Sequence, residues 1–238
     1  MVCSRLFVTF GVDLEKHKVK KKQHHKKMES SLTLPEKIYL LSIHPQKGGM
    51  VATAFNHMNY VVSGAVLLDL YVGNKIRFEG KKAVLTDKKY LDPVQKLSIE
   101  KMEKAGTPRS VYRWIQRFSW SYRSVKKLII QSLVSKRLIR VEQKQFLFFR
   151  WKKVYLVDRM RVAKMVDEIE SWIFRGAGDD ANRCLLSLLP QSGLFSRLFS
   201  RREKRKPARE QLKQMGIENV VSKAVVRAIR AKHVAVAS

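Results

Sequence analysis

The stretch that most constrains the fold runs from Tyr60 to Asp87. Its first half is apolar on every side, because Asp69 is the only charged residue between Val61 and Val72. A helix without a polar face belongs in the centre of a domain. It is also too short to span a bilayer, which requires about 20 apolar residues. We therefore predict a buried core helix here, with no cofactor site in it.

After Gly73 the period of the apolar residues changes from helical to two. Ile76, Phe78 and Val84 alternate with polar residues around a turn at residues 80–82, Gly-Lys-Lys. Glycine commonly ends helices, and alternation is typical of half-buried strands. We therefore predict that the helix stops at this glycine and is followed directly by a short β-hairpin near residues 75–87.

The order of these residues resembles the Golgi phosphoprotein 3 family. Residues 63–70, Ser-Gly-Ala-Val-Leu-Leu-Asp-Leu, are similar to the family's Gly-x-x-Leu-x-(Asp/Glu)-Leu helix, and residues 73–76, Gly-Asn-Lys-Ile, stand where the family has Gly-Arg-Ile. A second landmark is Leu-Thr-Leu-Pro-Glu at residues 32–36, before a Leu-rich helix. The resemblance implies a mainly α-helical, single compact domain over residues 30–238 with two short β-hairpins, near residues 75–87 and 138–157.

The net charge is extreme, at +29 for 238 residues. It predicts a polyanionic partner, either phosphate-bearing lipid at a membrane surface or nucleic acid, and says nothing about the fold. Residues 16–27 are a block of like charges that repel one another, so we expect residues 1–29 to form a basic disordered tail. Because the resemblance begins only near Leu32, we hypothesise that Met28 is the physiological start.

Signatures of catalysis and metal binding are missing from the sequence. It has no phosphate-binding Gly-x-x-x-x-Gly-Lys loop, no Gly-x-Ser-x-Gly, no His-Glu-x-x-His and no cysteine pair at zinc spacing. Its two cysteines, Cys3 and Cys184, give no disulfide framework, and the apolar run Leu6–Val12 is a weak signal peptide. We predict a cytoplasmic, non-catalytic protein with no cofactor and no metal.

Caps and turn residues place the remaining elements. Thr33 and Glu36 form a capping box with Pro35 in the first helical turn. Further helices are expected over residues 92–104, over 111–118 with a start at Thr107-Pro108, and over 122–137, 158–174 and 185–189. We also expect β-structure over 138–157 and basic helices on both sides of Pro207 that end near Lys232.

The first candidate site is Arg123 with Lys126 and Lys127, which are neighbours on one face of a helix. Clustered phosphates of a phosphoinositide headgroup could bind such cations, whereas the alternative is a solvated basic face. In the family, phosphatidylinositol 4-phosphate is bound by a Trp, an Arg before the central helix and two Arg at i, i+3. By resemblance, Arg123 and Lys126 match the pair, but the other two positions fall on Ser63 and Ala54.

The second candidate is the apolar run Phe146, Leu147, Phe148 and Phe149, followed by Arg150, Lys152 and Lys153. Four successive apolar residues cannot all face one side of a strand. Either both faces are buried, or one presents an apolar patch to a partner or a bilayer. The resemblance aligns this run with a family hairpin used for self-association and membrane insertion.

The third candidate spans residues 194–206. Leu194, Phe195, Leu198 and Phe199 form one helical stripe before a dense cationic run. This composition is typical of an interfacial helix on anionic lipid, and the alternative is a helix that packs its stripe on the domain and leaves a solvated basic tail.

The function implied by the resemblance is peripheral membrane binding through phosphoinositide headgroups. Family adaptors act on the cytosolic face of the Golgi and retain membrane-protein clients, so the expected partners are a phosphatidylinositol phosphate, a client and further copies of the chain. The alternative is nucleic-acid binding, because a basic helix followed by a β-hairpin is similar to a winged helix. A third hypothesis, a scaffold that self-assembles through the hairpin, is compatible with both.

Overall fold

The computed structural model describes residues 32–176, 178–199 and 201–237. The chain divides into two units between Leu32 and Thr33, and all of the described helices and strands belong to the second unit. The predicted basic tail, residues 1–29, lies outside the described residues.

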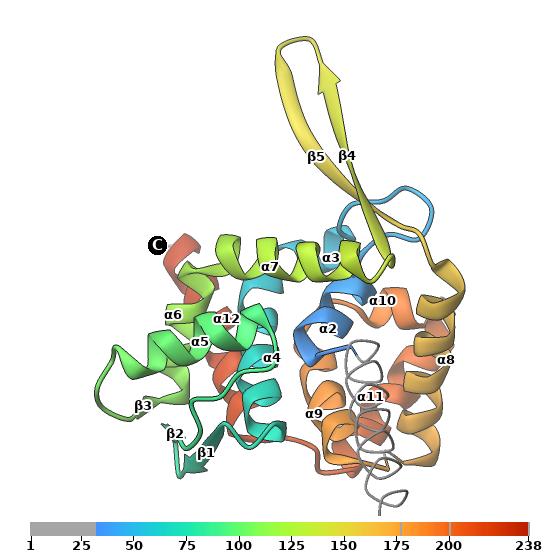
Figure 1. The fold of residues 1–238 in the computed structure, drawn as a ribbon. Coiled ribbons are helices and arrows are strands. Elements are labelled where there is room, and N and C mark those ends of the chain that lie inside the picture. The colour runs from blue at the N-terminus through green and yellow to red at the C-terminus, as the bar shows by residue number, and fades with distance from the viewer. Residues whose placement is uncertain (1–31, 177, 200, 238) are drawn as a thin grey trace, which may run out of the picture. The chain divides into compact units, whose positions relative to one another are not determined.

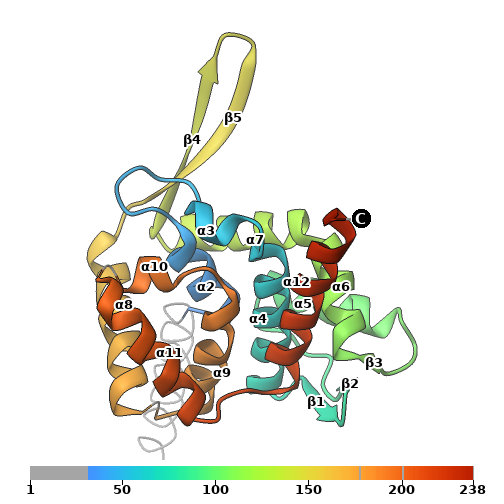
Figure 2. The same ribbon diagram turned by 180° about the vertical axis from the view of Figure 1, so that it is seen from behind.

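The apolar helix α4, Met58–Val72, lies at the centre of the domain, as its sequence predicts (Figure 1). Four helices pack around it: α2 (Leu34–Ser42), α6 (Val111–Trp120), α9 (Asp180–Leu188) and α12 (Val220–Ala237). A Cβ at Gly64 would lie only 2.7 Å from Val225 Cγ2 and 3.1 Å from Leu188 Cδ2. The glycine therefore allows α12 and α9 to approach α4 closely, as the rear view in Figure 2 illustrates for α12.

Side-chain caps fix the starts of two neighbouring helices. The predicted capping box of α2 is confirmed, since Thr33 Oγ1 accepts from the amide of Glu36 and the Glu36 carboxylate accepts from the amide of Thr33. Helix α5, Pro93–Glu103, begins where Asp92 accepts from the amides of residues 94 and 95.

The single charge of α4 joins these helices. The carboxylate of Asp69 accepts from the backbone amide of Leu34, at 2.9 Å, and from Gln95 Nε2, at 3.0 Å. Burial raises the pKa of Asp69, and the two hydrogen bonds act in the opposite direction. Asp69 thus connects α4 to α2 and α5 and has the role of a satisfied core residue.

The first predicted hairpin is confirmed as strands β1 (Ile76–Glu79) and β2 (Lys82–Leu85), and a third strand extends it. Strand β3 (Arg109–Ser110) pairs with β2, so the expected helix start at residues 107–108 is wrong. Helix α6 begins at Val111, where the Ser110 side chain accepts from the amide of Arg113. A strand of two residues has no period by which the sequence could reveal it.

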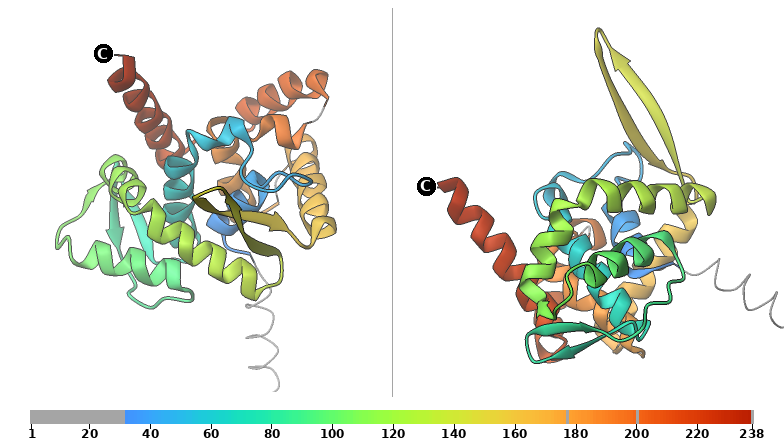
Figure 3. Two further views of the ribbon diagram at one scale, coloured as in Figure 1. Left: turned by 90° about the horizontal axis from the view of Figure 1, so that it is seen from above. Right: turned by 60° about the vertical axis from the view of Figure 1, so that its left-hand side comes forward.

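The second predicted hairpin follows helix α7, Tyr122–Ser135, and consists of β4 (Ile139–Phe146) and β5 (Phe149–Leu156). Only its base is buried, and the hairpin projects away from the helices (Figures 1 and 3). The loop after α2 holds this base, because the Gly49 amide donates to the Val154 carbonyl at 2.7 Å.

The C-terminal third consists of helices with short connections. Helix α8 (Arg159–Arg175) ends at Gly176, which has a φ of 97°. Helix α9 begins at Asp180, five residues earlier than predicted, because Asp179 caps it. The remaining elements are α3 (Ala52–Phe55), α10 (Phe195–Leu198), α11 (Arg205–Gln214) and the short helical turns η1 (Leu189–Gln191) and η2 (Arg202–Lys204).

The prediction of a mainly α-helical domain with two short hairpins is confirmed. Across the part of the chain that the structure describes, no helix has the length and apolar character needed to cross a membrane.

Candidate functional site

Helix α7 carries the three cations of the first candidate site. Arg123 and Lys127 are exposed and Lys126 is half-buried. At about 100° per residue they lie within an arc of about 100° on the helix surface. The adjoining face of α7 packs into the core through Val125, Ile129 and Leu133. None of the three cations forms an ion pair with another described residue, so their charge is available to an external anion.

A buried ionic cluster fixes the position of α7. The carboxylate of Glu36, only 3% exposed, accepts from Lys136 Nζ at 2.7 and 2.9 Å and from Ser132 Oγ at 2.5 Å. Lys136 follows α7 directly and Ser132 belongs to its last turn. Because a buried carboxylate is costly to leave unpaired, this cluster holds α7 firmly against α2. The cations at the start of α7 therefore stand on a rigid support.

The two remaining positions of the family pocket do not join the α7 cations. Ser63 lies inside α4, is buried, and donates to the carbonyl of Asn59 at 2.6 Å. Ala54 is completely buried in α3. Its neighbour Phe55 is 71% exposed at the end of that helix. Neither small side chain can contact a headgroup, so any anion site on α7 consists of the α7 cations without these two partners.

The second candidate site is the tip of the β4–β5 hairpin. The exposed fractions of Phe146, Leu147, Phe148 and Phe149 are 67, 68, 95 and 74%. Phe146 and Phe149 pair across the strands and therefore share a face, while Leu147 and Phe148 form the turn. Leu147 adopts a φ of 50°, a left-handed conformation that glycine or asparagine usually supplies. The described residues leave this run exposed, which excludes burial of both faces. The alternative that stands is an apolar patch presented to a partner or a bilayer.

Cations lie directly behind this apolar tip. Arg150 and Lys152 are exposed and Lys153 is half-buried. Arg150 Nε donates to Gln145 Oε1 at 3.2 Å, across the strands. An apolar tip followed by positive charge is the order that a bilayer with anionic headgroups would match.

The structure does not bring the α7 cations and the hairpin tip together. Strand β4 has eight residues, and at about 3.3 Å per residue the tip lies about 26 Å beyond the hairpin base. A flat bilayer can touch both sites only if the hairpin leans toward the plane of α7.

The third candidate, residues 194–206, does not form the interfacial helix expected from its composition. Helix α10 has only four residues, and the apolar stripe is buried in the domain: Leu194, Phe195, Leu198 and Phe199. The cationic residues that follow are mostly exposed, and Lys204 pairs with Glu170 at 2.5 Å. Of the two alternatives for this stretch, the structure therefore supports the one in which the stripe packs on the domain.

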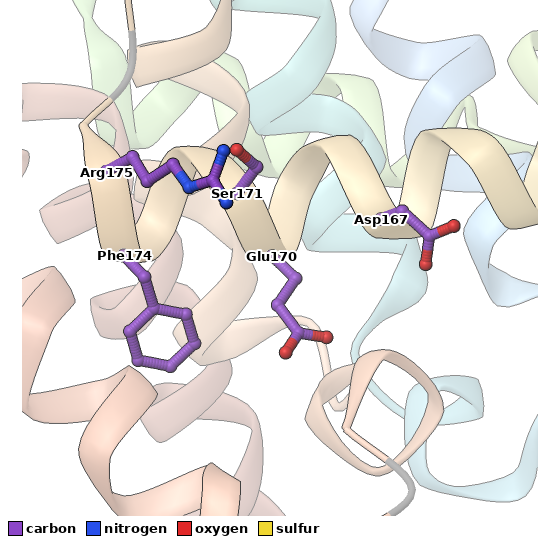
Figure 4. Close-up of a pocket in the computed structure, with 5 residues that line it drawn as sticks. All are labelled: Asp167, Glu170, Ser171, Phe174 and Arg175. Atoms are coloured by element: carbon purple, nitrogen blue, oxygen red, sulfur yellow. The ribbon is translucent and has the colours of Figure 1, made fainter.

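A shallow pocket of about 320 Å³ lies along α8, away from these sites in the sequence (Figure 4). Its described lining is Asp167, Glu170, Ser171, Phe174 and Arg175. Two carboxylates and one guanidinium make the pocket unsuitable for phosphate, so it adds no anion site.

Sequence reasoning missed two features near the candidate sites. Trp120, the last residue of α6, is 82% exposed just before the α7 cations. On the hairpin, the ring of Tyr155 lies near three cations, Arg140, Lys144 and Lys153. The spacing of these residues gives no signal without the cross-strand register.

The family model described as Golgi phosphoprotein 3 (GPP34) matches residues 34–232. The comparison with curated proteins gives no match. The matched range includes α7 and the hairpin and begins at the first residue of α2.

Proposed function

Since the chain belongs to the Golgi phosphoprotein 3 family, we propose that it is a non-catalytic adaptor that binds anionic membranes peripherally. The lipid is a phosphatidylinositol phosphate or a headgroup of similar charge, and the membrane surface is the cytosolic one, as at the Golgi. A membrane-protein client and a homo-oligomer formed through the hairpin belong to the same proposal.

The exposed hairpin tip is the observation that carries the proposal. Four large apolar side chains, all at least 67% exposed, are unusual on a protein surface unless something covers them. Each gains up to about 1.5–3 kcal/mol on full burial in an apolar phase. Each cation near an anionic surface adds about 1 kcal/mol. Tip and cations together therefore favour a bilayer over water.

The α7 cations supply the headgroup contact in this proposal. Arg123 and Lys126 can donate charge-assisted hydrogen bonds to one phosphorylated headgroup, while Lys126 lacks the bidentate fork of an arginine. With small buried residues at positions 54 and 63, we expect broad affinity for anionic lipid and weak discrimination among phosphoinositides.

Vesicle flotation tests the proposal. Phosphatidylcholine vesicles with and without phosphatidylinositol 4-phosphate are compared for the wild type, Phe148→Asp, and Arg123→Glu with Lys126→Glu. The matched control is Lys101→Glu with Lys104→Glu, which reverses two cations at the same spacing on and just after α5. The tip variant and the α7 variant should each lose at least about tenfold in binding, and the control much less.

Equal binding by all four proteins would contradict the proposal. The nucleic-acid alternative predicts a different result: tight binding to duplex DNA with a steep salt dependence and no flotation with vesicles. The apolar tip opposes that alternative, because a wing that contacts phosphates gains nothing from three exposed phenylalanines.

A further inference from the structure

One face of the β4–β5 hairpin presents an ordered series of side chains. The strand register pairs Phe146 with Phe149, Lys144 with Trp151, Glu142 with Lys153, and Arg140 with Tyr155. Alternate residues of a strand share a face, so all eight side chains lie on the same side. From tip to base the series runs from aromatic residues, through a Trp–Lys pair, to charged residues and a tyrosine.

Three cations of this face gather around the ring of Tyr155. Arg140 Cζ, Lys144 Nζ and Lys153 Nζ lie 5.4, 5.7 and 5.6 Å from the ring centroid. The ring itself is held by the loop after α2, because a Cβ at Gly48 would lie 2.4 Å from Tyr155 Cδ1. The cations are therefore arranged around a fixed aromatic ring.

Lys144 points away from the hairpin tip. Its backbone lies opposite Trp151, yet its ammonium group contacts the Glu142 carboxylate at 2.7 Å and lies near Tyr155, which is closer to the base. Lysines beside apolar surface extend in this way, with the stem along the apolar part and the charge toward the polar phase. The outer end of the face is consequently left to aromatic side chains.

Glu142 is the only acidic residue in this series. It pairs with Arg140 at 3.0 Å and with Lys144 at 2.7 Å. Hydrogen bonding to Lys144 lowers the pKa of Glu142, so its carboxylate is ionised at neutral pH. Three cations against one carboxylate leave a local excess of two positive charges, and the carboxylate occupies the place that a phosphate could take.

The register sets how deep the tip lies when the cations around Tyr155 reach the phosphates. Lys153 is five residues and Arg140 seven residues from the two-residue turn, which is about 16 and 23 Å at 3.3 Å per residue. The headgroup region of one leaflet is about 5–8 Å thick. When these cations are at the phosphates of an upright hairpin, the apolar tip therefore lies beyond the headgroup layer, in the hydrocarbon.

We propose that Arg140, Lys144 and Lys153, arranged around Tyr155, form a phosphate site in the hairpin stalk for the headgroups of an anionic bilayer. Glu142 is an internal competitor that the lipid phosphate displaces. The inference rests on the proposed function, because it requires the tip to enter the bilayer first, and it adds a second phosphate contact made by side chains outside α7.

Vesicles of phosphatidylcholine with phosphatidylglycerol test this site, because phosphatidylglycerol is anionic only through its phosphate. The variant Lys144→Gln with Lys153→Gln is compared with Arg150→Gln with Lys152→Gln, which removes the same charge from the opposite face of the hairpin. We expect the first pair to bind about tenfold more weakly than the second.

A complementary variant is Glu142→Gln, with Glu79→Gln on β1 as its control, since Glu79 is also an acid paired with an arginine. Removal of the competitor should strengthen binding about fivefold, the factor that corresponds to one additional basic charge near the surface, and the control should change it less than twofold. Equal effects in each matched pair would overturn the stalk site. If Phe148→Asp also bound like the wild type, the proposed function itself would be wrong.

Discussion

Helix α4 and the β4–β5 hairpin tip are both strongly apolar, yet the first is mostly buried and the second is exposed. In α4 most apolar side chains are buried against the surrounding helices, apart from Tyr71 and Val72 at its end, and its one charge is hydrogen-bonded. At the hairpin tip, Phe148 is 95% exposed, and cations follow on both faces. Apolar character alone therefore does not distinguish core from binding surface. The distinction comes from the surroundings, which are packed helices around α4 and cations around the tip.

The charged groups of the two regions differ in the same manner. Near α4, the buried Glu36 carboxylate accepts hydrogen bonds from the amide of Thr33 and from the side chains of Ser132 and Lys136. On the hairpin, Arg150 and Lys152 are exposed and have no acidic partner among the described residues. Charge in the first region stabilises the fold, whereas in the second it remains available to a partner.

The largest expected effect comes from truncating the core helix. Leu67 is fully buried, so Leu67→Ala should lower the free energy of unfolding by about 2–5 kcal/mol through lost burial and the cavity that remains. Phe148→Ala is the matched variant at the hairpin tip and should change stability by less than about 0.5 kcal/mol. Urea unfolding measures both. A comparable loss in the two variants would mean that the tip also belongs to the core.

A smaller effect is expected from the buried ion pair. Lys136→Met leaves the Glu36 carboxylate without its cation in a buried site, which should cost about 3 kcal/mol. Lys152→Met on the hairpin removes the same charge from an exposed site and should cost almost nothing. Thermal unfolding of the two variants would show whether charge contributes to the fold only near α4.

The smallest effect concerns pH at the exposed end of α4. His57 Nε2 lies 3.3 Å from His233 Nε2 of α12, and burial first, then the charge of His233, lowers the pKa of His57. Below the unfolded-state pKa of about 6.5 the unfolded chain binds more protons at this site, so stability is lost as pH falls. Wild type should lose stability relative to His57→Gln between pH 7.5 and 5. A constant difference across that range would show that the contact is not coupled to folding.

Much of the helical core could be predicted from local signals. The uninterrupted apolar run gave α4, and the Thr33 and Asp92 caps with their prolines gave α2 and α5. The helix end at residue 73 was predicted, although Asn74 rather than Gly73 adopts the left-handed conformation. These signals succeed because they act within a few residues of one another.

Features that depend on distant partners were not predictable in this way. The apolar stripe of residues 194–199 has the same spacing whether it faces lipid or core, and only the tertiary packing decides. The α7 cations could be found from their helical spacing. The cluster around Tyr155 could not, since it depends on the cross-strand register and on a turn at residues 147–148 without glycine or asparagine.

The depth of the hairpin tip in a bilayer tests the central claim most directly. An environment-sensitive dye can be attached at Phe148→Cys after Cys3→Ser, because burial raises the pKa of the Cys184 thiol to about 11 and makes that residue unreactive near neutral pH. With anionic vesicles we expect a blue-shifted emission that brominated acyl chains quench, whereas the same dye at Lys104→Cys should show neither. An unshifted, unquenched tip on protein that still floats with the vesicles would contradict insertion of the hairpin into the membrane.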